Sequence, residues 1–169
     1  MTNLPATPSS PSSDSGRALL RHTVATLAYR GSKALRDAPA DFSAFTPGGE
    51  GRSAGAILAH IGDLLDWALS MASGDSQWHT SKPQAWNEDV NRFHAALTAF
   101  DAYLASDQPL HASAEKLFQG PIADALTHVG QLAMMRRLAG APIKGENYAV
   151  ARITAGRVGA DQAAAKREF

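Results

Sequence analysis

The residues of this sequence that are best suited to chemistry are one aspartate and two histidines. Asp124 and His128 are four residues apart in an otherwise apolar segment, PIADALTHVGQLAMMRRLAG. In a helix, a spacing of four places both side chains on one face, one turn apart. His60 lies in the apolar stripe of another expected helix, within AHIGDLLDW. Two imidazoles and a carboxylate that meet between two helices would form a site for a divalent metal ion.

Each of these residues also has an interpretation that needs no metal. A carboxylate buried without a partner costs several kcal/mol, so Asp124 needs a cation, which Arg136 or Arg137 could supply only by reaching along their own helix. Near a first turn, the helix dipole alone stabilises a carboxylate by about 0.3–1 kcal/mol. A lone histidine such as His60 on an apolar face is most often a core residue bonded to a backbone carbonyl.

Other residues rank behind this set. Gln131 continues the stripe of Asp124 and His128 and is expected to support the ligands, whereas His94 is the best substitute for a third ligand. The chain has no cysteine, no Gly-x-Ser-x-Gly motif and no phosphate-binding glycine loop, so nucleophilic catalysis and nucleotide binding find little support. No catalytic residue can be assigned.

Composition limits the class of protein. The chain has 169 residues, of which 44% are hydrophobic, as expected for one globular domain. Lysine plus arginine and aspartate plus glutamate each total 16, and this balance argues against nucleic-acid binding and against docking on an anionic membrane. No apolar run approaches the ~20 residues that span a bilayer, and no secretory signal is evident, so we expect a cytoplasmic protein.

Apolar periodicity predicts an all-α protein with four helices. The expected helices cover residues 16–37, 53–73, 85–106 and 121–139, the last being apolar around most of its circumference and therefore expected to be the most buried. Ser53 is a good N-cap and Gly74 a good C-terminal cap for the second helix.

The two ends of the chain differ from its centre in composition and in predicted structure. Residues 1–15 are rich in proline and serine and predict a flexible arm, or one that lies across a partner subunit. Residues 16–140 form the expected bundle. Residues 141–169 predict an extension packed on it, with a short helix near 147–155.

Residues 17–166 resemble the DinB-like family of four-helix bundles, a superfamily that also contains the mycothiol-dependent maleylpyruvate isomerases. The most specific matches are AHIGDLLDW around His60 and ALTHVGQLAMMRRLAG around His128. In that family a histidine on the second helix and two histidines four apart on the fourth hold a divalent ion, often nickel or zinc. The resemblance implies that His60 and His128 are ligands, and Asp124 stands where the family usually has its other histidine.

The resemblance also carries expectations for the fold and the tail. It implies an up-down-down-up bundle with a C-terminal extension. The tail GENYAVARITAGRVGADQ looks typical of a subgroup of the family, in which Glu146 and Asn147 would approach the mouth of the bundle and join the polar surroundings of the ion. The alternative is a solvated Glu146.

Two functions remain open from the sequence. In the first, the protein is a metal-dependent enzyme acting on a small molecule, either a thiol S-transferase or isomerase, as relatives suggest, or a hydrolase. In the second, it is a non-catalytic bundle that binds or associates. A homodimer is expected because it is the commonest assembly for such proteins.

Overall fold

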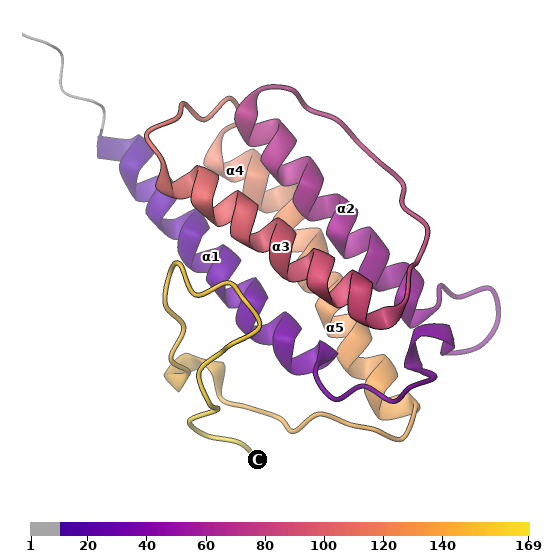
Figure 1. Cartoon of the computed structure of the whole chain (residues 1–169). Helices are drawn as coiled ribbons and strands as arrows, with labels where there is room; N and C mark the ends of the chain where they lie inside the picture. Colours follow the sequence, from indigo (N-terminus) through magenta and orange to yellow (C-terminus); the bar gives the residue numbers. More distant parts are fainter. Residues whose placement is uncertain (1–10) are drawn as a thin grey trace, which may run out of the picture.

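The computed structural model describes residues 11–169 and is helical throughout its core (Figure 1). No strand occurs in this part of the chain, so the all-α prediction is confirmed. The helices are α1 (Pro11–Leu35), α2 (Ala54–Ser73), α3 (Trp86–Ala105), α4 (Ala114–Leu117) and α5 (Ala123–Leu138), with a π-helical turn, Phe118–Ile122, joining the last two.

The helices form a bundle in which α2 and α3 run in the same direction (Figure 1). The connection over residues 74–85 makes this possible, because it returns along the whole length of the bundle before α3 begins. α1 and α5 run in the opposite direction. Each of α1 and α2 packs against both α3 and α5, so the interface between α2 and α5 is one side of the bundle.

The core is built from the apolar stripes that the sequence predicts. On α1, the buried positions include Leu20, Val24, Leu27 and Leu35. More than half of α2 is buried, whereas fewer than a third of the residues of α5 are. The prediction that residues 121–139 form the most buried helix is therefore wrong. The reason is that α5 packs on α1 and α2 with one side only and exposes part of its apolar surface.

The helix ends show which local signals decide a boundary. Ser53 Oγ accepts a hydrogen bond from the Ala56 N–H at 3.2 Å, and Gly74 takes the left-handed conformation with φ 94°, as predicted for α2. Helix α1 begins at Pro11, so it includes residues 11–15 of the expected arm, while residues 1–10 lie outside the described residues.

The fourth helical segment also begins earlier than predicted. It starts at Ala114 after the N-cap Ser113, and Pro121 lies inside the π-helical turn instead of opening the helix. Because proline has no N–H to donate, it is tolerated where a wider turn already changes the hydrogen-bond pattern.

The C-terminal extension returns to α1. Inside it, Glu146 is buried and accepts hydrogen bonds from the Tyr29 hydroxyl at 2.6 Å and from Lys33 Nζ at 2.9 Å. Burial and the adjacent Glu146 raise the pKa of Tyr29 to about 12. The expected helix near 147–155 is only a 3-10 turn, Tyr148–Val150. Among residues 11–169, no helix combines the length and apolar character needed to cross a bilayer.

Close packing between α1 and α3 gives a first prediction. A Cβ at Gly31 would lie 2.4 Å from Cζ of Phe93, a ring that is completely buried and would have to shift within the core. We expect Gly31→Ala to lower the free energy of unfolding by about 1–3 kcal/mol in urea denaturation.

The matched control for this substitution is Gly130→Ala. Gly130 is an exposed position inside α5 where an added Cβ has no neighbour within 4 Å. Alanine favours helix over glycine, so this variant should gain up to about 1 kcal/mol. If Gly31→Ala is as stable as Gly130→Ala, the packing argument is wrong.

Candidate metal centre

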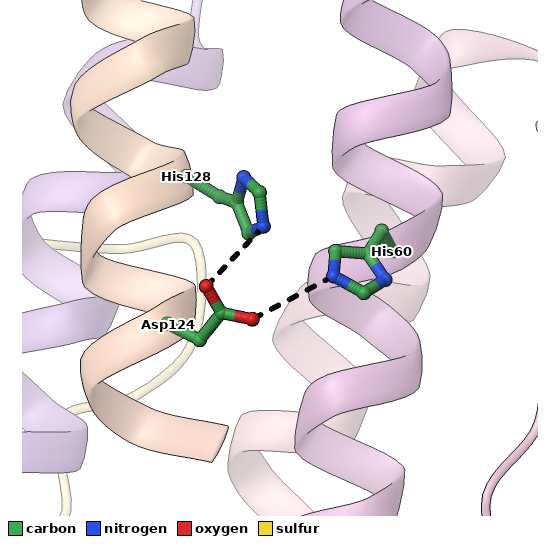
Figure 2. Close-up of side chains that lie close together, drawn as sticks. All are labelled: His60, Asp124 and His128. Carbon is green, nitrogen blue, oxygen red and sulfur yellow. Dashed lines mark ion pairs between the residues drawn. The ribbon is translucent and has the colours of Figure 1, made fainter. Parts of the chain in front are cut away.

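The three residues singled out in the sequence meet where α2 packs against α5 (Figure 2). His60 extends from α2, and Asp124 and His128 extend from successive turns of α5 toward it. Because Asp124 and His128 are four residues apart, both lie on the face of α5 that packs against α2. His60 belongs to the apolar stripe of α2 and therefore points toward them.

The donor atoms lie at distances that suit a shared ion. His60 Nε2 is 3.7 Å from Asp124 Oδ2, and His128 Nε2 is 3.5 Å from Asp124 Oδ1. One donor atom from each residue lies within 4.8 Å of the other two. Bonds of about 2.0–2.1 Å in tetrahedral geometry place neighbouring ligand atoms roughly 3.4 Å apart. The residues therefore fit a divalent ion after only small side-chain movements.

The same distances are too long for direct hydrogen bonds, which for an N–H donor end near 3.2 Å. The cluster is thus not a closed hydrogen-bonded network. The two imidazole rings stand nearly perpendicular, with centroids 4.8 Å apart and an interplanar angle of 82°. Perpendicular rings of this kind allow both Nε2 atoms to face the carboxylate from different directions.

The ring of His128 is held in one orientation by Gln131. His128 Nδ1 lies 2.8 Å from Gln131 Oε1. An amide oxygen only accepts hydrogen bonds, so Nδ1 must carry the proton and Nε2 must carry the lone pair. A histidine ligand commonly donates its second N–H in this way, and the bond fixes the tautomer that binds a metal.

His60 is kept in its neutral form by its surroundings. Burial lowers the pKa of His60, and the nearby His128 and Arg52 lower it further, against the opposing effect of Asp124 and Asp63. A neutral imidazole is the form that donates a lone pair to a metal. The imidazole of His60 is thus in its metal-binding form at neutral pH.

The burial of the three side chains differs from the expectation for Asp124. The side chain of Asp124 is 48% exposed, whereas those of His60 and His128 are 20% and 13% exposed. The expected buried carboxylate is therefore wrong, and desolvation supplies no argument for a cation. Asp124 lies in the first turn of α5, at the outer edge of the cluster, where water reaches it.

A cavity of about 630 Å³ adjoins the cluster. Beside the three donor residues it is lined by polar and apolar side chains from α2, α5 and the loop before α2, namely Pro47, Arg52, Ile57, Gln131, Met134, Met135 and Leu138. The donors are therefore accessible to a small molecule from one side.

Several predicted residues lie elsewhere. The structure brings neither Glu146 nor Asn147 to this site, because the extension that carries them packs against α1. Asn147 instead accepts a hydrogen bond from the Ala149 N–H through its own side chain. His94, the substitute ligand, has its Nδ1 3.4 Å from the Val158 carbonyl oxygen.

Two neighbours of the cluster were missed in the sequence. Trp78, in the connection between α2 and α3, packs edge-on against His60 with ring centroids 5.6 Å apart. Arg52 lines the cavity from the position just before the N-cap of α2. Because Arg52 precedes the extended N-cap Ser53, helical spacing does not place it relative to His60, and no local signal predicts its position.

Arg136 does not approach Asp124, although one interpretation of the sequence made it the cation that pairs with this carboxylate. Its guanidinium donates to the carbonyl oxygens of Ala34, Arg36 and Asp37 at 2.8–3.1 Å, and Nε donates to the Ala141 carbonyl. It therefore ties the end of α5 to the end of α1.

Comparisons with protein-family models, with curated proteins and with solved structures found no match to this chain. The resemblance to the DinB-like family accordingly stays a prediction.

Two partly buried histidines predict how stability depends on pH. Burial lowers the pKa of both His60 and His94 in the folded protein. The unfolded chain therefore takes up protons first as the pH falls below about 6.5, and the folded state loses stability. We expect the free energy of unfolding, measured with a chelator present, to be lower at pH 5 than at pH 7.5.

The control is His94→Asn, which keeps a donor near the position of Nδ1 and cannot titrate. This variant should lose less stability over the same pH range. Equal stability of the unmodified protein at both values would contradict the assignment of neutral histidines.

Proposed function

We propose that this protein is a DinB-like metal protein that holds one divalent ion, nickel or zinc, through His60, Asp124 and His128. The observation that carries the proposal is the convergence of three donor side chains from two helices at the end of a cavity. Two features support the family as well. Helices α2 and α3 run the same way, and the donors come from the second and the fourth helical segments.

The donor set favours nitrogen- and oxygen-binding ions. Two imidazoles and one carboxylate suit zinc, nickel and other first-row divalent ions, whereas the absence of cysteine from the sequence removes thiolate ligation. Three protein ligands leave a coordination position open, which is the usual arrangement of a catalytic site as opposed to a structural one. The cavity lies beside that position.

The proposed activity is that of a metal-dependent enzyme acting on a small molecule. When bound, the ion supplies Lewis-acid chemistry that lowers the pKa of a water or thiol ligand, which serves a hydrolase or a thiol S-transferase or isomerase. The protein residues have distinct tasks: Gln131 fixes the tautomer of His128, and the Asp124 carboxylate compensates part of the charge of the ion. A cytoplasmic homodimer remains part of this proposal, and light scattering of the purified protein tests the dimer.

The first test is the metal content of protein purified without an affinity tag. We expect close to one equivalent of nickel or zinc by elemental analysis, and loss of most of it in His128→Ala and in Asp124→Asn. The matched control is His22→Ala, an exposed histidine of α1, which should keep the metal.

Circular dichroism establishes that each variant remains folded. Wild-type protein that stays free of metal after incubation with nickel, zinc and manganese would overturn the proposal and favour the non-catalytic bundle.

A second test concerns the residue that orients His128. Gln131→Ala removes the acceptor of the Nδ1 proton and leaves all three ligands in place. We expect the affinity for zinc, measured by competition with a chelator, to fall about 10–100-fold. Gln131→Glu keeps an acceptor and should retain most of the affinity, and an unchanged affinity in Gln131→Ala would mean that the hydrogen bond does not orient the ligand.

A further inference from the structure

The cavity beside the metal centre is lined by two chemically different groups of side chains. The three donor residues and Gln131 form one polar region. The remaining wall is apolar, except for Arg52, and it includes Met134 and Leu138, which are both 57% exposed. Large apolar side chains that gather at an open cavity, and not singly over the surface, are typical of a ligand-binding surface.

Arg52 is the one cationic side chain among the residues that line this cavity. Within the part of the chain that the structure describes, it has no carboxylate or carbonyl partner. Arg21, Arg92 and Arg136, in contrast, donate to acceptors of the protein itself. The guanidinium of Arg52 lies close enough to His60 for its charge to act on that ring.

We propose that this cavity binds a small molecule that carries a carboxylate, an apolar body and a donor atom for the divalent ion, with Arg52 binding the carboxylate. This inference rests on the proposed function, because the ion binds the donor atom of the ligand. It goes further by naming the chemical class of the ligand and the residue that selects it.

The charges of the cavity support an anionic ligand. A divalent ion, one carboxylate and one guanidinium leave two positive charges in excess, because a histidine binds a metal as the neutral imidazole. A ligand with an ionised donor atom and a carboxylate balances them. A carboxylate matches a single guanidinium through two parallel N–H···O bonds. A phosphate dianion would be expected to meet more than one cationic side chain, and this lining offers one.

The apolar body of the ligand follows from the apolar part of the lining. Pro47, Ile57, Met134, Met135 and Leu138 contribute no donor or acceptor from their side chains. A polar chain laid against them would lose its hydration without new hydrogen bonds. An alkyl or aryl chain that covers the same side chains removes apolar surface from water, which makes the free energy of binding more favourable.

The test uses the full-length protein loaded with cobalt, whose absorption reports ligand binding. The probes are hydroxamates with an alkyl chain of increasing length, each made in two forms that end in a carboxylate or in a carboxamide. For at least one chain length, we expect the carboxylate form to bind at least about fivefold more tightly than the carboxamide form. The preference should shrink as salt is raised, because the Arg52 side chain is exposed.

The variant Arg52→Gln should bind both forms equally and keep its cobalt. The matched control is Arg137→Gln, which removes an exposed arginine of α5 that does not line the cavity and should keep the preference. Leu138→Asn should weaken the binding of the carboxylate and carboxamide forms of a long-chain probe to the same extent.

The outcomes separate the two proposals. Failure to bind cobalt would overturn the proposed function and this inference with it. Cobalt binding without a carboxylate preference at any chain length, or a preference that survives in Arg52→Gln, would overturn this inference alone.

Discussion

The packing of α2 against α5 determines where every donor atom of the candidate site lies. Residues 74–122 separate the two helices in the sequence, so no local signal sets their distance. It is set by the apolar stripes on both sides of the site, such as Leu58 and Ile61 on α2 and Ala125 and Val129 on α5, which are all buried. Because interiors are close-packed, small changes in these side chains would be expected to move the imidazoles by a comparable amount.

A second set of contacts keeps α2 in place and brings Trp78 to the site. The buried Asp63 accepts hydrogen bonds from Arg92 at 2.7 Å and from the N–H and hydroxyl of Ser81 at 2.9 and 2.6 Å. Burial alone would raise the pKa of Asp63, but these donors outweigh it and lower the pKa. Ser81 belongs to the connection that returns along the bundle, so this carboxylate fixes the segment that carries Trp78 to His60. Asp63 is thus a structural residue.

Local signals predicted the helices, and long-range packing explains the failures. Ser53 and Gly74 fixed the ends of α2 because caps act within a few residues. The pair Asp124 and His128 could be recognised because helical spacing alone places both on one face. The position of Glu146 could not, since it depends on how the extension folds back on Tyr29 and Lys33. The exposure of Asp124 could not be predicted for the same reason. The apolar residues around Asp124 in the sequence do not show which side of α5 the other helices cover.

The electrostatics of the cluster give the strongest reason to expect a cation, independent of the burial argument that failed. Gln131 assigns the His128 proton to Nδ1, so the lone pair on Nε2 faces Asp124 Oδ1 at 3.5 Å. His60 approaches the other carboxylate oxygen at 3.7 Å, and its lowered pKa disfavours the charged ring that would form an ion pair. Nε2 of a neutral His128 and Oδ1 of Asp124 are both acceptors, and acceptor atoms that face one another repel. A positive ion between them would convert this repulsion into coordination, and Arg52, the one cationic side chain among the residues that line the adjoining cavity, adds positive charge that an anionic ligand could balance.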